Sequence, residues 1–127
     1  MSENIEQHAE GAARSLNELV ADLQNRGIEY PLEAYRILSY LTRAAGEMRT
    51  ALELIGTSVQ GLQDKGLLMS DFRGEPLDEV LRRFTESSVA AQGLAGGLND
   101  TLSKAYSAAG HLAYNETPEE HQSAAGN

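Results

Sequence analysis

The sequence predicts an all-α protein, an antiparallel three-helix bundle of coiled-coil type with a flexible C-terminal tail. Apolar residues recur in steps of three and four over most of the 127 residues. Gly and Pro occur where helices would end and begin, and no stretch alternates apolar and polar residues as a strand would. Because 41% of the residues are apolar and 23% are charged, the chain has enough apolar surface to fold.

The first helix is predicted over residues 4–26. Its apolar residues recur at helical spacing, at Ile5, Ala9, Ala12, Leu16, Leu19 and Leu23. Gly27 and Pro31 then mark the end of this helix and the start of the next, because Gly favours helix ends and Pro favours the first helical position.

The second helix is predicted over residues 32–65. Apolar residues fill the a and d positions of a heptad repeat at Leu38, Leu41, Ala45, Met48, Leu52, Ile55, Val59 and Leu62. A further stripe lies at the adjoining g and c positions, at Ile37, Tyr40, Ala44, Ala51 and Leu54. The first and third helices together could cover both stripes, or part of this wide surface could meet another chain.

Residues 66–76 form a connector that contains Leu67, Leu68, Met69 and Phe72. These side chains could close the end of the bundle. They could equally form an anchor of the aromatic and Met-rich kind that interfaces favour.

The third helix is predicted over residues 77–113. Its seam residues are Leu77, Leu81, Phe84, Ser88, Ala91, Ala95, Leu98, Leu102, Ala105, Ala109 and Leu112. Glycine inside a helix costs roughly 0.5–1 kcal/mol relative to alanine. Gly56 could therefore break the second helix, and Gly96 with Gly97 could end the third and let a fourth begin.

One domain, residues 1–114, accounts for all the helices, and the short connectors favour antiparallel neighbours. Residues 115–127 form an acidic tail without an apolar repeat, so we expect this tail to be flexible.

The net charge of −9 excludes a typical nucleic-acid-binding surface, because such surfaces need Lys and Arg to neutralise phosphates. The excess lies at the ends of the chain. Residues 1–27 and 115–127 each carry −3, whereas 28–66, 67–76 and 77–114 each carry −1. The charge suggests an acidic inhibitor or DNA mimic as a third function, but the near-neutral central segments argue against it.

Sequence motifs for catalysis, metal binding and cofactor binding were not found. Gly61–Gly66 has the spacing of a phosphate loop, but Leu67 stands where that loop needs Lys. His8, His111 and His121 have no ligand-type partner at helical spacing, and the chain has no Cys. We therefore expect a protein that is not an enzyme and binds neither cofactor nor metal.

No apolar run approaches the roughly 20 residues that cross a bilayer. The first residues, MSENIEQHAEG, carry acids where a secretion signal carries basic residues. We expect a cytoplasmic protein, with export that does not use a classical signal as the alternative.

In size and helical architecture the chain resembles the substrates of type VII secretion, the WXG100 group, and its eight Arg against two Lys are typical of a high-GC bacterium. It departs from that group at both motifs. Leu54, Ile55 and Gly56 lie inside a helical repeat instead of a Trp-x-Gly turn, and neither Tyr106 nor Tyr114 is followed by an acid four residues later.

The function predicted first is a protein–protein interaction or assembly module that also self-associates. The predicted partner-binding residues are Ile37, Tyr40, Leu54, Leu68, Met69 and Phe72. A secreted helical substrate or effector is the alternative.

Overall fold

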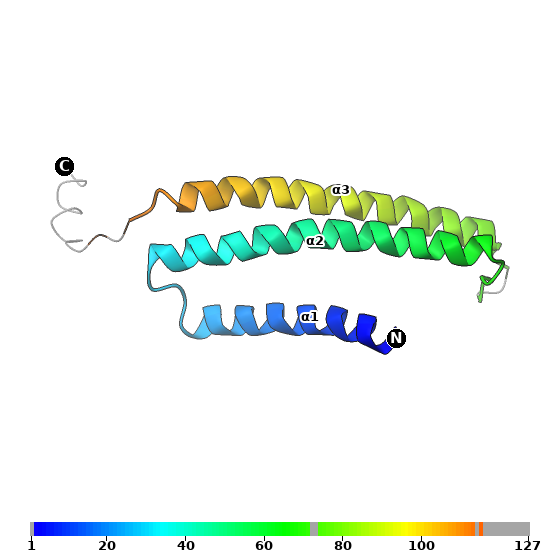
Figure 1. The fold of residues 1–127 in the computed structure, drawn as a ribbon, viewed down its shortest axis with the longest axis horizontal. Coiled ribbons are helices and arrows are strands. Elements are labelled where there is room, and N and C mark those ends of the chain that lie inside the picture. The colour runs from blue at the N-terminus through cyan, green and yellow to red at the C-terminus, as the bar shows by residue number, and fades with distance from the viewer. Residues whose placement is uncertain (1, 72–73, 114, 116–127) are drawn as a thin grey trace. The chain divides into compact units, whose positions relative to one another are not determined.

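The computed structural model describes residues 2–71, 74–113 and 115, and every regular element within them is an α-helix (Figure 1). The helices are α1 (Ser2–Asn25), α2 (Pro31–Asp64) and α3 (Leu77–Ala109). The all-α prediction with three helices is therefore confirmed. Residues 35–111 form one structural unit, an α2–α3 hairpin, and α1 belongs to another. Most of the predicted tail, and Phe72, lie outside the described residues.

α1 ends at a glycine in the left-handed region. Gly27 has φ 73°, and its backbone N–H donates to the carbonyl oxygen of Asp22, 3.4 Å away. Glycine adopts this conformation without a steric penalty, so it terminates the helix as the sequence predicts. On the surface of α1, the Arg14 guanidinium lies 2.6 Å from the Glu10 carboxylate one turn earlier.

The start of α2 is fixed by a proline and a carboxylate. Pro31 is the first helical residue, and the Glu33 carboxylate accepts hydrogen bonds from the backbone N–H groups of Glu29 (3.0 Å) and Tyr30 (3.3 Å). The Arg26 guanidinium also contacts Glu33, at 3.2 Å. These bonds, first from Glu29 and then from Arg26, lower the pKa of Glu33. Such a contact satisfies N–H groups that a helix start leaves free.

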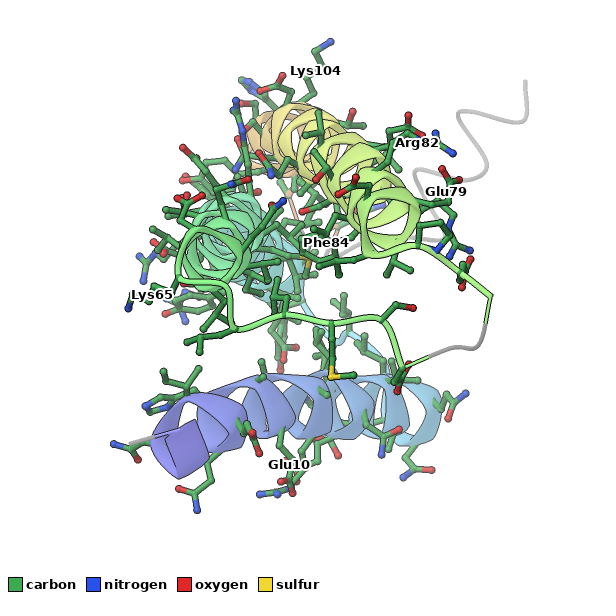
Figure 2. The ribbon with its side chains drawn as sticks, turned by 90° about the vertical axis from the view of Figure 1, so that its right-hand side faces the viewer. Glu10, Lys65, Glu79, Arg82, Phe84 and Lys104 are labelled. Carbon is green, nitrogen blue, oxygen red and sulfur yellow. The ribbon has the colours of Figure 1, made fainter. Side chains whose placement is uncertain are left out.

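α2 and α3 lie antiparallel, side by side. Along the hairpin Tyr35 contacts Tyr106, the Asn99 amide donates to the Thr42 carbonyl oxygen (2.7 Å), and a Cβ built on Gly56 would lie 3.8 Å from the Ser88 hydroxyl. Phe84 projects from α3 into the space between the helices, whereas Lys65 and Lys104 project away from it (Figure 2).

Two glycines allow the chain to reverse between α2 and α3. Gly66 has φ 71°, and its N–H bonds the Gln63 carbonyl oxygen while the Leu67 N–H bonds that of Leu62. This pair of bonds is the usual glycine-based helix ending. Gly74 has φ 79° just before Pro76, which precedes the first residue of α3.

The glycines inside the helices do not break them. α2 continues through Gly56 and α3 through Gly96 and Gly97, so the alternative with a break at these glycines is wrong. Packing explains the continuity, because Ala95 is buried and Gly96 lies against the Arg49 side chain. Tertiary contact outweighs the weak helix preference of glycine.

α3 ends at Ala109, four residues before the predicted end at 113. The His111 N–H bonds the Ala108 carbonyl oxygen three residues earlier, which tightens the last turn. Gly110 also fits closely against the Tyr35 ring, 3.6 Å from where a Cβ would stand.

The predicted a/d seam is half wrong on α2. The residues that face α3 are Tyr35, Leu38, Thr42, Ala45, Arg49, Leu52, Gly56 and Val59. Of the predicted d positions, Met48, Ile55 and Leu62 are exposed by 47%, 51% and 41%. Ala45 and Gly56 are the small residues in this contact, and small residues let two backbones approach more closely than large side chains would.

In the second half of α3, too, the side that faces the other helix differs from the predicted seam. The residues that face α2 there are Ala95, Asn99, Leu102, Tyr106 and Ala109. The predicted seam residues Leu98, Ala105 and Leu112 are exposed. Among the described residues the fully buried apolar side chains are the alanines Ala45, Ala95 and Ala109. The hairpin therefore has a thin core, and several of its large apolar side chains, Met48, Ile55, Leu94 and Leu98 among them, are exposed.

Candidate functional site

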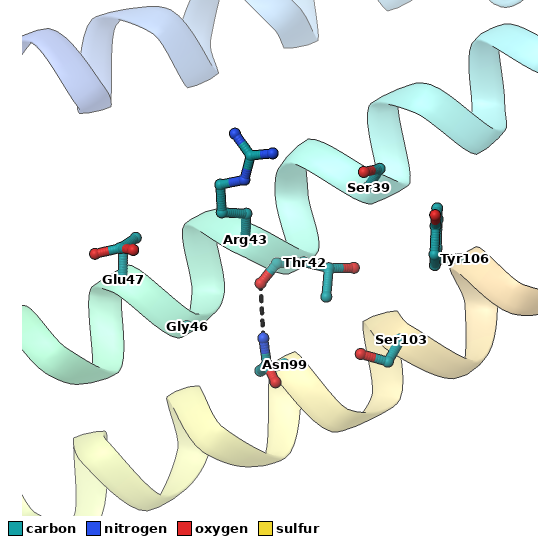
Figure 3. A pocket seen from close by; sticks show the side chains of 8 residues that line it. All are labelled: Ser39, Thr42, Arg43, Gly46, Glu47, Asn99, Ser103 and Tyr106. Atoms are coloured by element: carbon teal, nitrogen blue, oxygen red, sulfur yellow. Dashed lines mark hydrogen bonds between the residues drawn. The ribbon is translucent and has the colours of Figure 1, made fainter.

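One side of the hairpin carries two hollows. The first, of about 410 Å³, is shown in Figure 3 and is lined by Ser39, Thr42, Arg43, Gly46, Glu47, Asn99, Ser103 and Tyr106. The Asn99–Thr42 hydrogen bond crosses it, and Arg43 extends away from α3 at its rim. Nearby, the Tyr35 and Tyr106 rings meet edge to face at 4.4 Å and their hydroxyls are 2.7 Å apart.

The second hollow, of about 500 Å³, lies nearer the connector. Its walls are Glu53, Gly56, Thr57, Gln60, Gly61 and Asp64 on α2 and Phe84, Thr85, Ser88, Val89 and Gln92 on α3. The Gln60 amide donates to the Asp64 carboxylate at 2.9 Å on its rim. Both of its carboxylates, those of Glu53 and Asp64, lie exposed to water.

The opposite side of the hairpin is apolar. Several residues that line the hollows come directly after a residue that faces α3 in the sequence: Ser39 follows Leu38, Arg43 follows Thr42 and Thr57 follows Gly56. Successive residues of a helix are rotated by about 100°, so the residues that precede the facing residues project to the other side. From Ile37 on, these are Ile37, Leu41, Ala44, Met48, Ala51, Ile55 and Ser58 on α2, and Leu62 lies one turn after Ser58 on the same side.

α3 contributes to the same side. Thr85 and Val89 follow the facing residues Phe84 and Ser88 and line the second hollow together with Thr57 of α2. The residues that precede facing residues on α3 therefore share the side opposite the hollows. Apart from Arg83 at the connector end, whose guanidinium bonds the Glu75 carboxylate, they are Val80, Ser87, Ala91, Leu94, Leu98, Thr101, Ala105 and Ala108. We call these positions of the two helices together the apolar face.

The apolar face is exposed and uncharged. Leu94 is 75% exposed and Leu98 is 49% exposed, in addition to Met48, Ile55 and Leu62. All the residues that define the face are uncharged, and α3 has no charged residue at all from Ser87 to Asn99. Large exposed apolar patches are uncommon on monomeric proteins.

The predicted partner-binding residues do not form one site. Ile37 is half-buried on the apolar face, whereas Tyr40 and Leu54 are exposed on the outer side of α2. In the connector Leu68 is half-buried and Met69 is 83% exposed. Because α2 rises about 1.5 Å per residue, Ile37 and the connector are separated by about 40 Å.

Sequence reasoning missed the strongest members of the face. Met48, Ile55 and Leu62 were assigned to the seam inside the bundle, and Leu98 likewise. The signal that could have revealed the face is the uncharged run on α3 from Ser87 to Asn99. A solvent-facing helix normally carries charges on its outer side.

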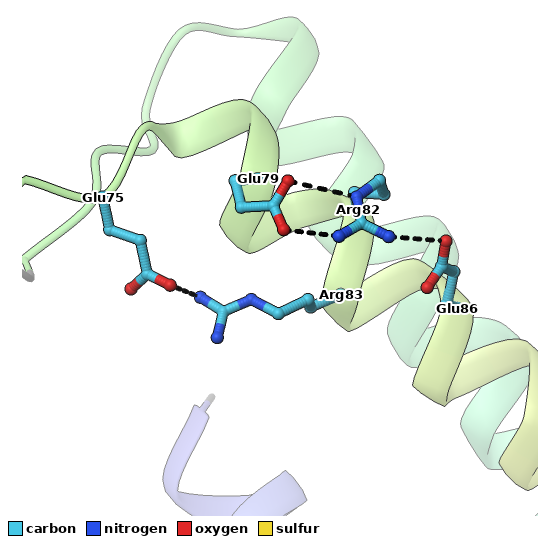
Figure 4. A network of polar contacts seen from close by, with 5 residues as sticks. All are labelled: Glu75, Glu79, Arg82, Arg83 and Glu86. Atoms are coloured by element: carbon cyan, nitrogen blue, oxygen red, sulfur yellow. Dashed lines mark hydrogen bonds and ion pairs between the residues drawn. The ribbon is translucent and has the colours of Figure 1, made fainter.

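A network of charged side chains fixes the start of α3 (Figure 4). The Arg82 guanidinium bonds both Glu79 and Glu86, the latter at 2.9 Å, and the Arg83 guanidinium bonds the Glu75 carboxylate. The hydrogen bond from Arg82 lowers the pKa of Glu79. These groups are exposed and satisfy one another, so they serve the structure of the hairpin end.

No protein-family model, no curated protein and no solved structure matches this chain. Within residues 2–71, 74–113 and 115, no cluster of three or more His, Cys, Asp or Glu is arranged to hold a metal ion. In the same residues, no helix is both long enough and apolar enough to span a bilayer.

Proposed function

We propose that this protein is a non-enzymatic interaction or assembly module that binds another protein chain through the apolar face. The observation that carries the proposal is the position of its large apolar side chains. The α2–α3 contact buries alanines, while Met48, Ile55, Leu94 and Leu98 remain open to solvent.

The energetics support a binding role for this face. Full burial of one Val, Leu, Ile or Met side chain stabilises by roughly 1.5–3 kcal/mol. Side chains that are half exposed have gained only part of that free energy. A partner that covers five such residues would gain several kcal/mol, which is enough to drive specific association.

The titratable groups support a protein without catalysis. The pKa of Glu33 and of Glu79 is lowered by hydrogen bonds that hold the carboxylates ionised. The hydrogen bond to Tyr106 raises the pKa of Tyr35, so this hydroxyl stays protonated at neutral pH. A general base needs a pKa near the working pH and a free proton-accepting atom, which these groups lack.

Three neighbouring lysine substitutions on α2 test the proposal. Ile55→Lys places a charge on the apolar face, Leu54→Lys on the outer side and Thr57→Lys in the hollow. The tagged wild type should capture a protein from a lysate of the source organism, endogenous copies of the chain included. Capture should be lost with Ile55→Lys and kept with Thr57→Lys.

The outcome for Leu54→Lys separates two surfaces. Retained capture by this variant supports the apolar face, whereas loss equal to that of Ile55→Lys supports the outer side that the sequence indicated. Capture that survives Ile55→Lys, or a wild type that captures nothing, contradicts the proposal. Circular dichroism of each variant confirms that helix content is retained.

The alternatives of a secreted substrate and an acidic inhibitor gain no support from the apolar face. Leu54, Ile55 and Gly56 lie inside α2, away from the hairpin turn. An acidic inhibitor would need a charged binding surface, and the apolar face has no charged residue among those that define it.

A further inference from the structure

We infer that the chain on the apolar face is a second copy of this protein, so that two α2–α3 hairpins form an antiparallel four-helix assembly. This inference rests on the proposed function and names the partner. Three properties of the face argue for it: its extent, its charge and its distribution of large and small residues.

The extent fits a stable dimer. The 26 residues from Ile37 to Leu62 cover about 38 Å at the helical rise. Two helices side by side, each about 10 Å across, present a face about 20 Å wide. The product, about 750 Å², is close to the roughly 800 Å² that each partner buries in a standard protein interface. A second hairpin, with helices of 34 and 33 residues, has the same dimensions.

The charge of the hairpin permits contact between identical surfaces. Residues 28–114 carry a net charge of −3, and the residues that define the apolar face carry none. The remaining −6 lies in residues 1–27 and 115–127. The charged side chain at the connector end of this face, Arg83, bonds the Glu75 carboxylate, so two identical faces bring no unpaired like charges together.

On the apolar face, a large residue of α2 and a small residue of α3 lie at the same height along the hairpin at two places. The Gly56–Ser88 contact places Ile55 level with Ser87 and Ala91, and the Tyr35–Tyr106 contact places Ile37 level with Ala105. At the middle of the hairpin, near the Thr42–Asn99 bond, Met48 is level with Leu94 and Leu98. Ile37 and Ile55 thus have small residues of α3 beside them, whereas Met48 has the large residues Leu94 and Leu98 beside it.

This distribution is self-complementary. A two-fold axis parallel to the helices places α2 of one copy over α3 of the other, with the two antiparallel and at the same level. Ile37 and Ile55 then face the small residues Ala105, Ser87 and Ala91 of the second copy, and the same contacts repeat across the axis. Large residues that face small ones allow two layers to interdigitate.

Analytical ultracentrifugation of the full chain tests the inference. The wild type should sediment as a dimer at micromolar concentration. Because each face residue is buried twice in a symmetric dimer, Ile55→Lys should weaken dimerisation roughly a hundredfold or more. Leu94→Lys should do the same, and at 75% exposure its replacement does not disturb the contact between α2 and α3. Thr57→Lys is the matched control and should leave the dimer intact.

A wild type that is monomeric at all concentrations overturns the inference. That result is expected where α1 of the same chain, or a different protein, covers the face. If such a monomer still captures another protein and Ile55→Lys abolishes the capture, the proposed function stands and only the second copy is excluded. A dimer that resists both Ile55→Lys and Leu94→Lys also overturns the inference.

Discussion

Replacement of Gly61 and Gly97 by alanine should stabilise the hairpin. Both residues lie in the interior of unbroken helices, and a Cβ added at either would meet no atom within 4 Å. Glycine at such a position costs roughly 0.5–1 kcal/mol relative to alanine, because the unfolded chain loses more conformational freedom. The two sites are on different helices and far apart along them, so their effects should add to about 1–2 kcal/mol.

Thermal unfolding followed by circular dichroism measures this effect. For a chain of this size, 1–2 kcal/mol corresponds to a rise in the melting temperature of about 4–8 °C. Wild type and variant must be compared at equal protein concentration, since association also raises the melting temperature. Gly46→Ala is the control, because its Cβ would lie 3.3 Å from the Asn99 amide nitrogen and the Asn99–Thr42 bond would have to adjust.

The reasoning is refuted if the double variant melts at or below the wild-type temperature. Such a result would mean that the helices are interrupted at these glycines or that their outer surfaces are covered. A gain with Gly46→Ala equal to that of the double variant would show that the α2–α3 contact is looser than described.

Three further changes probe the hairpin and its ends. Ala95→Leu overfills the contact between α2 and α3, where Ala95 is buried, and should lower the free energy of unfolding by about 1–3 kcal/mol in urea titrations; an unchanged midpoint would contradict the packing. Asn99→Ala removes the hydrogen bond to the Thr42 carbonyl oxygen and should cost about 1 kcal/mol by the same assay, whereas Ser107→Ala on the exposed side should cost little. The pKa of Glu79 is lowered below its ordinary value of 4.5. The contribution of this carboxylate to the stability of the folded state is therefore present above pH 4.5 and is lost as the pH falls through the pKa of the folded state. The protection of amides in the first turns of α3, taken relative to the intrinsic exchange rate at each pH, should therefore fall at low pH in the wild type and depend less on pH in Glu79→Gln; identical profiles would exclude the role of the Glu79–Arg82 contact.

The sequence predicted the class and the bounds of the helices well. Gly27, Pro31, Gly66 and Pro76 each mark a helix end within about two residues, because their backbone preferences act locally. The end of α3 was missed by four residues. Ala109 is followed by a tight turn at Gly110 that depends on contact with Tyr35, 75 residues away in the chain.

The sequence did not predict which side of each helix faces the other. Heptad periodicity was correct, but on α2 two parallel stripes share that period, and periodicity does not say which one meets α3. The choice depends on Ala45, Gly56 and Ala95, whose small side chains allow close approach, and on the Tyr35–Tyr106 and Asn99–Thr42 pairs. Because this contact contains polar residues, an apolar pattern does not identify the side of α2 that packs against α3.

The apolar face as a whole was not predicted from the sequence for the same reason, although Ile37 belongs to it. Ile37, Tyr40 and Leu54 were selected because they fell outside the assumed seam, and Met48 and Ile55 were assigned to it. Once the facing side is known, the exposed stripe is the one that includes Met48 and Ile55, and Leu94 and Leu98 of α3 join it.

Paramagnetic relaxation enhancement between two copies is the most direct test of the symmetric dimer formed through the apolar face. The chain has no cysteine, so Ser58→Cys gives a single spin-label site at the border of the apolar face. The spin-labelled chain, at natural isotope abundance, is mixed with a nitrogen-15-labelled chain that carries no spin label. Any broadening of the nitrogen-15 amide signals then reports contact between copies. The account predicts broadening of α3 amides in residues 83–91 of the second chain, which lie level with residue 58, and little in residues 103–109. No broadening between copies, or broadening confined to the side of Thr57 and Thr85, would contradict it.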